Sequence, residues 1–150
     1  RARLFNGNPV WVFTSRVDAG KAARLAARNV RVIQLPVGSN GAIDLDGFMQ
    51  WLGAHEINEV HVEAGARLLG ALVAGNYVDE WIGYVAPCVL GAGQGLAALP
   101  APIAGLDQAY RYEFLDAVQL GRDMRVHLRQ ADRWQALRAA CGLTEQQAAA

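Results

Sequence analysis

The residues best suited to chemistry lie where a predicted strand meets a predicted helix, at Val62–Glu63–Ala64–Gly65. An apolar strand ends at Glu63, small residues form a turn, and a helix begins directly afterwards. Such a junction places free backbone N–H groups and the positive end of a helix dipole at the carboxyl edge of a sheet. Small residues here and at Gly70 leave room for a phosphate to approach the backbone. The pattern therefore favours an anion-binding site.

Glu63 is the one acidic residue among the last apolar positions of that strand. Two interpretations stand side by side. The carboxylate could accept hydrogen bonds from hydroxyl or N–H groups of a substrate that lies over the sheet edge, or it could be a solvated group near a strand end. The next acidic pair, Asp79–Glu80, is interpreted as a cap of the preceding turn rather than as a catalytic pair.

Metal and thiol chemistry find little support in the sequence. No two of the histidines, His55, His61 and His127, have metal-ligand spacing with a carboxylate or thiol, so no metal site is predicted. Cys88 and Cys141 are far apart and form neither a metal pair nor a disulfide framework. Reduced thiols are the expectation.

The first half of the chain alternates strands and helices. Apolar β-branched runs predict strands, Ala-rich or amphipathic stretches predict helices, and Asp18 is expected to cap the first helix. The second helix should start near Asp44 or Asp46, and Asn76 should end the third in a left-handed conformation. This alternation predicts parallel strands with right-handed crossovers. The expected strands are 9–15, 30–35 and 57–63, and the expected helices are 19–28, about 44–52 and 66–75.

The second half has a different pattern. Residues 123–129 alternate strictly, with Met124 and its partners on one face and three basic residues on the other. Together with a strand within 110–120 they form a predicted hairpin at Gly121–Arg122, so the sheet should be mixed. Further expectations are a strand within 77–90, a loop at 91–105, a helix at 131–141 and a frayed tail at 144–150.

Composition excludes several classes of protein. With 150 residues, 53% hydrophobic and 19% charged, the chain should fold as one globular domain. Fourteen basic and fourteen acidic side chains leave no net charge, so nucleic acid is not an expected partner. No apolar run is long enough to cross a membrane, and a cytoplasmic location is expected. The start at Arg1 without Met suggests a piece of a longer chain.

Several motifs resemble the reductase domain of bacterial bifunctional riboflavin-biosynthesis deaminase-reductases. The resemblance is strongest over 57–91 and rests on Ile57–Gly65, Leu68, Gly70–Leu72, Val78–Glu80, Tyr84–Pro87 and Gly121–Arg129. It implies an α/β, dihydrofolate-reductase-like three-layer fold, with a mixed, mostly parallel sheet, flanking helices and a C-terminal β-hairpin. Residues 1–130 would form the reductase domain without the family's N-terminal part, and 131–150 a C-terminal helical extension.

The resemblance also implies an activity: NADPH-dependent reduction of 5-amino-6-(5-phosphoribosylamino)uracil to the ribitylamino form in riboflavin biosynthesis. By motif match, Glu63 corresponds to a residue that contacts the substrate, whereas no catalytic residue is assigned. The residues that correspond to the family's NADPH-binding segment are Gly65, Ala66, Arg67, Leu68, Leu69, Gly70 and Ala71. Arg67 and Cys88 depart from the family pattern, which usually has a small or hydroxylic residue and a Lys there.

Three further expectations follow from the resemblance. The partners would be a small-molecule phosphoribosyl-pyrimidine, a second copy in a homodimer, and an upstream zinc deaminase domain on the full-length, multifunctional enzyme. Rival hypotheses are a catalytically inactive binding or oligomerisation module of the same fold, and a related pyrimidine or pterin reductase. Because same-fold reductases strain this turn, we also expect an unusual backbone at Ala64–Gly65, such as a cis peptide.

Overall fold

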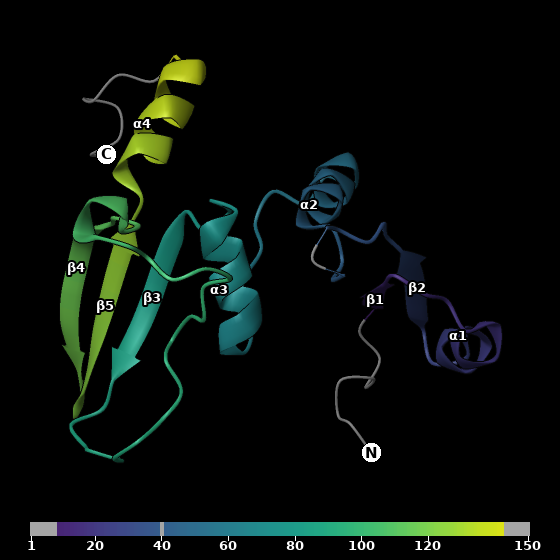
Figure 1. The fold of residues 1–150 in the computed structure, drawn as a ribbon, viewed down its shortest axis with the longest axis horizontal. Helices are drawn as coiled ribbons and strands as arrows, with labels where there is room; N and C mark the ends of the chain where they lie inside the picture. The colour runs from purple at the N-terminus through teal and green to yellow at the C-terminus, as the bar shows by residue number, and fades with distance from the viewer. Residues whose placement is uncertain (1–8, 40, 143–150) are drawn as a thin grey trace. The chain divides into compact units, whose positions relative to one another are not determined.

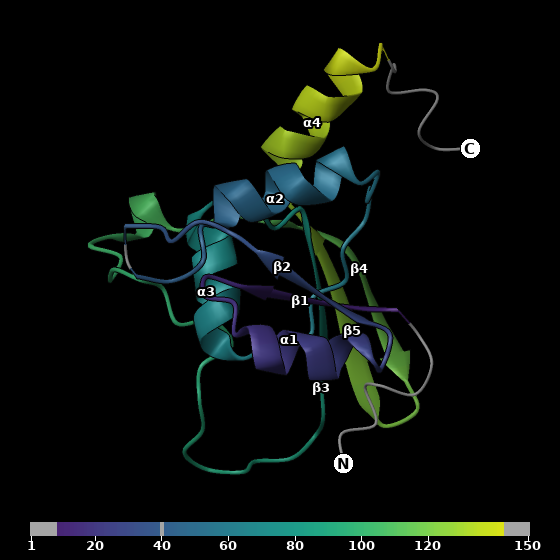
Figure 2. The same cartoon turned by 90° about the vertical axis from the view of Figure 1, so that its right-hand side faces the viewer.

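The computed structural model describes residues 9–39 and 41–142, which form two compact units divided between His61 and Val62. Figures 1 and 2 show their helices and strands. The expected domain boundary at residue 130 stays a prediction. Among the described residues, no helix is both long enough and apolar enough to cross a membrane. The tail expected to fray at 144–150 lies outside the described residues.

The first unit is built on a strand–helix–strand motif. Strand β1 (Val10–Thr14) pairs in parallel with β2 (Val30–Gln34), and helix α1 (Ala19–Ala26) connects them. The Asp18 side chain accepts a hydrogen bond from the backbone N–H of Lys21, which confirms the predicted cap. Parallel strands need a crossover of this kind, because a tight turn cannot join them.

Helix α2 (Leu45–Ala54) packs an aromatic stripe against β1. Asp44, not Asp46, is its N-cap and accepts from two backbone N–H groups. The rings of Phe13 and Phe48 meet edge to face at 4.8 Å between centroids, and those of Trp11 and Trp51 at 5.0 Å. These pairs join the inward face of the strand to the apolar stripe that predicted the helix.

The second unit combines helix α3 (Ala66–Ala74) with an antiparallel sheet in the order β3–β5–β4. The strands are β3 (Glu80–Val85), β4 (Glu113–Leu120) and β5 (Asp123–Arg129). Gly121 has φ +62°, so the hairpin predicted at Gly121–Arg122 is confirmed, with glycine where the turn needs a left-handed residue. The 3₁₀ helix η2 (Leu106–Gln108) precedes β4, and α4 (Ala131–Ala140) follows β5.

The end of α3 is fixed by Asn76, which has φ +58° as the sequence predicts. Its Oδ1 accepts a hydrogen bond from Gln130 Nε2 at 2.7 Å, and its carbonyl accepts one from Arg133. Asparagine tolerates the left-handed region better than most residues because its short side-chain amide can form hydrogen bonds with nearby groups. The same residue that ends α3 therefore holds the start of α4.

The strand expected at 57–63 is wrong, because residues 57–65 contain no strand. A β-strand exists only where a neighbouring strand completes its hydrogen-bond ladder, and this segment pairs with neither sheet. Among the described strands, β1 and β2 pair in parallel, whereas β5 pairs antiparallel with both β3 and β4. Both kinds of pairing therefore occur, and the antiparallel kind is the commoner.

Few side chains are deeply buried among the described residues. The core of the first unit holds Val30, Leu35 and Leu52, and that of the second holds Leu72 and Val73 from α3. Many large apolar side chains of the β3–β5–β4 sheet stay exposed, including Phe114 at 70% and Tyr84 at 66%.

Candidate functional site

The start of α3 differs from the starts of α1 and α2. Those two helices begin behind Asp18 and Asp44, whose carboxylates accept hydrogen bonds from first-turn N–H groups. Helix α3 begins behind Gly65, which has no side chain to do so. The N-cap residue of α3 therefore supplies no side-chain acceptor to the first N–H groups of the helix, which lie at its positive end.

The backbone of this turn is ordinary. Gly65 has φ −74° and ψ 163°, and no cis peptide bond occurs among the described residues, so the expected cis peptide at Ala64–Gly65 is wrong. The physical reason is that an extended N-cap residue already aims the following N–H groups outward, so no strain is needed. A Cβ on Gly65 would meet no atom within 4 Å, so the approach to the helix start is open.

The predicted site residues fall on one short segment of the second unit but differ in exposure. Glu63 is exposed and directly precedes the turn. Within the predicted cofactor segment, Gly65, Arg67 and Leu68 are exposed, whereas Ala66, Leu69 and Ala71 are half-buried and Gly70 is buried. The exposed members cluster at the N-cap and in the first turn of α3.

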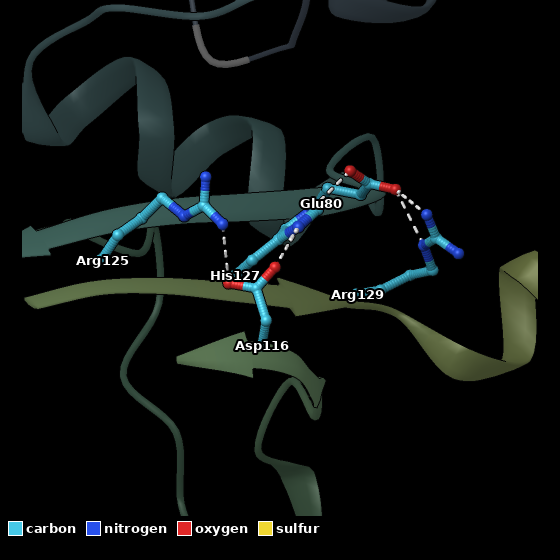
Figure 3. Close-up of polar contacts among 5 residues, drawn as sticks. All are labelled: Glu80, Asp116, Arg125, His127 and Arg129. Atoms are coloured by element: carbon cyan, nitrogen blue, oxygen red, sulfur yellow. Dashed lines mark hydrogen bonds and ion pairs between the residues drawn. The ribbon is translucent and has the colours of Figure 1, made fainter. Parts of the chain in front are cut away.

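A second polar cluster lies on one face of the β3–β5–β4 sheet (Figure 3). Glu80 on β3 does not cap the preceding turn. Its Oε2 accepts from His127 Nε2 at 2.7 Å, and two nitrogens of Arg129 converge on its Oε1 at 2.8 and 2.6 Å. Asp79 likewise pairs with Arg133, at 3.0 Å. The acidic pair thus ties β3 to β5 and to α4.

Asp116 joins this cluster because of an irregularity in β4. The register with β5 shifts between Phe114 and Asp116, so Leu115 is the extra residue of a bulge. The extra residue turns Asp116 onto the face that carries His127. There its carboxylate pairs with Arg125 at 3.0 Å and lies 3.7 Å from His127 Nδ1. Both ring nitrogens of His127 therefore face a carboxylate oxygen.

The electrostatics of the cluster act on Glu80. Partial burial by itself would raise the pKa of Glu80, but the hydrogen bonds and charges of His127 and Arg129 outweigh it. The net effect lowers the pKa of Glu80 below its ordinary value of 4.5. The carboxylate is therefore ionised at neutral pH and serves as an anchor for two basic side chains.

Sequence reasoning missed this cluster as a unit. The strict alternation of 123–129 predicted that Arg125, His127 and Arg129 share a face, which the register confirms. Their carboxylate partners come from two other strands and depend on the register and on the bulge at Leu115. The only signal in the sequence was that three basic residues on one strand face need acidic partners.

Within 9–39 and 41–142, no group of three or more His, Cys, Asp or Glu side chains could hold a metal ion. Cys88 and Cys141 are both free and exposed.

The chain is thus an α/β chain in which helix α3 starts behind Gly65, an extended N-cap residue without a side-chain acceptor. The chain belongs to the RibD C-terminal domain family, whose model matches residues 1–126.

Two curated relatives show how much of the chain this likeness covers. The riboflavin biosynthesis protein RibD of Escherichia coli is 39% identical over 100 residues, which are 66% of this chain and 27% of that protein. The 5-amino-6-(5-phosphoribosylamino)uracil reductase of Buchnera aphidicola is 32% identical over 89 residues, which are 59% of this chain and 43% of that protein. The chain therefore spans less than half the length of either relative.

Solved structures agree on the fold. The RibD structure of Acinetobacter baumannii (form 2) matches 86% of this chain and 35% of its own, with a TM-score of 0.64 and 30% identity. The riboflavin biosynthesis reductase Rib7 of Saccharomyces cerevisiae matches 82% of this chain and 56% of its own, with a TM-score of 0.59. At 17% identity this second likeness concerns the fold alone. The expected α/β, dihydrofolate-reductase-like fold class is confirmed.

Proposed function

We propose that this chain is part of a reductase of riboflavin biosynthesis, in which it holds a nicotinamide cofactor, NADPH, beside a phosphoribosyl-pyrimidine. The relative named as a 5-amino-6-(5-phosphoribosylamino)uracil reductase supports this choice of substrate. The observation that carries the proposal is the uncapped start of α3 in a chain of this family.

The residues at this turn fit a dinucleotide. Its phosphates need N–H donors that the protein leaves unused and a backbone they can reach. The open space at Gly65 and the exposed first turn meet both needs. Arg67 adds a positive charge in that turn, where the family usually has a small or hydroxylic residue.

Glu63 would act on the substrate rather than on the cofactor. Its carboxylate lies two residues before Gly65 and is exposed, so hydroxyl or N–H groups of the substrate can donate to it. When bound, NADPH supplies the hydride for the reduction. The work of the chain's own residues is alignment: the α3 start holds phosphate, and Glu63 orients the substrate.

The wider assembly is also part of the proposal. Exposed apolar side chains on β4, such as Phe114 and Leu120, suit a face covered by a second copy in a homodimer. An upstream zinc deaminase domain fits the greater length of the relatives named RibD, of which this chain spans 27% and 22%.

The helix start gives a sharp experiment. Gly65→Asp would place a capping carboxylate where α1 and α2 have Asp18 and Asp44, with open space around its Cβ and without strain at φ −74°. The new cap should stabilise the protein by only about 0.3 kcal/mol, because glycine is itself a well-tolerated N-cap residue. It should also weaken NADPH binding roughly tenfold or more, because it occupies the phosphate donors and repels the anion.

Gly65→Ala is the matched control, since it adds a Cβ in the same open space without a charge or an acceptor. Its effect on NADPH affinity, measured by calorimetry, should be clearly smaller. Equal affinities of Gly65→Asp and the unaltered protein for NADPH would overturn the proposed phosphate site.

A further inference from the structure

Gly70 lies in the middle of α3 and is buried. Glycine in a helix interior costs about 0.5–1 kcal/mol relative to alanine, so its presence needs a reason. The reason is not a left-handed backbone, because Gly70 is helical. A Cβ at this position would overlap the backbone of Ala98, whose nitrogen would lie only 2.9 Å away and whose carbonyl would lie closer still.

The segment around Ala98 belongs to the loop between β3 and η2. Figures 1 and 2 show this loop returning to α3 after it leaves β3. The Ala98 backbone N–H donates to the carbonyl of Ala66 at 2.9 Å, one turn before Gly70. The loop is thus seated on α3 by one hydrogen bond and by a backbone contact that only glycine permits.

The loop residues that follow Ala98 also lie beside α3. Ala74, the last residue of α3, lines a hollow of about 290 Å³ together with loop residues Leu99 to Ile103 and with Gln108 and Tyr110. The loop therefore follows α3 from its first turn, at Ala66, to its last residue.

We propose that Gly70 is a positioning residue, which seats the 91–105 loop on α3 so that the loop braces the first turn where the cofactor is held. This inference rests on the proposed function. Gly70 is buried beneath the loop, so its role toward the cofactor is indirect. It acts through Ala66 and Ala98 and not by a contact of its own.

Two variants break the contact from opposite sides. Gly70→Ala adds a methyl group that must displace Ala98, and Ala98→Pro removes the N–H that donates to Ala66 while α3 keeps its sequence. The matched control is Gly53→Ala in α2, where an added Cβ meets nothing within 4 Å. Both glycine variants gain the same intrinsic helix propensity, so a difference between them reports the loop contact.

Two readouts test the proposal in the full-length native protein. Hydrogen exchange of the 91–105 amides should speed up at least fivefold in Gly70→Ala and Ala98→Pro, and should be unchanged in Gly53→Ala. The KM for NADPH should rise about tenfold in both loop variants with kcat changed less than twofold, because uniform binding is lost.

Unchanged exchange of the 91–105 amides in both loop variants would overturn the seating of the loop. Faster exchange with an unchanged KM for NADPH would overturn the positioning role. If the unaltered protein shows no NADPH oxidation, the proposed function fails instead, and the exchange data still decide whether Gly70 seats the loop.

Discussion

The carboxylate of Glu80 on β3 accepts a hydrogen bond from His127 on β5 at 2.7 Å. The two residues are 47 positions apart in sequence, and they are not directly opposite in the ladder, since His127 faces Ile82 and Glu80 faces Arg129. Their contact is diagonal across the sheet, within reach of long side chains. Glu80 thereby holds two successive basic residues of the polar face at once.

The first prediction concerns the coupling between these two side chains. In a double-mutant cycle, Glu80→Ala and His127→Ala should show a coupling free energy of about 0.5–1 kcal/mol in urea unfolding, typical of a partly exposed ion pair. The control pair is Asp123→Ala with His127→Ala, because Asp123 is exposed at the start of β5. A Glu80–His127 coupling no larger than that of the control pair would contradict the contact.

The second prediction is a dependence of stability on pH. Because folding lowers the pKa of Glu80 below 4.5, the contribution of Glu80 is fully present above that value. It is lost as the pH falls through the lowered pKa of the folded state, since the unfolded chain binds the proton first. The difference in free energy of unfolding between the native protein and Glu80→Gln should therefore shrink below pH 4.5. A difference that stays constant down to strongly acidic pH would argue against this role.

The third prediction tests the left-handed residue after α3. Asn76→Ala should destabilise the protein by roughly 1–2 kcal/mol, because alanine pays the steric cost of φ +58° without the amide bond to Gln130. Asn76→Gly should cost less, since glycine adopts this conformation freely and loses only the side-chain bond. Thermal unfolding of the two variants gives the order, and an equal or greater loss in the glycine variant would refute it.

Local features of the fold could be predicted from the sequence because neighbouring residues determine them. Asp18 caps α1, Gly121 makes the hairpin turn, and Asn76 ends α3, each within a few positions of the element it controls. The segment 57–63 has a strand-like sequence but no strand neighbour in the structure, and pairing partners are not encoded locally.

The same distinction between local and long-range determinants applies to the candidate site. The helix start at Gly65 is local and was predicted, whereas the burial of Gly70 depends on Ala98, 28 positions away by their residue numbers. The Glu80 cluster needed the register of three strands and the bulge at Leu115. Contacts of this kind follow from tertiary packing, which no short motif reveals.

The fourth prediction separates the substrate from the cofactor. Glu63→Gln should lower kcat/KM for the pyrimidine substrate at least tenfold and change NADPH affinity less than twofold, because the carboxylate is expected to accept bonds from the substrate alone. Glu59→Gln is the matched control, since Glu59 is exposed on the same segment outside the motif turn. Equal losses in substrate use and NADPH affinity would count against this role of Glu63.

The most direct test of the proposed reductase is substrate-dependent oxidation of NADPH by the full-length native protein. NADPH absorbance should fall when 5-amino-6-(5-phosphoribosylamino)uracil is added, with one ribitylamino product formed for each NADPH consumed. A protein that binds NADPH but shows no oxidation above the rate without substrate would contradict the proposed function.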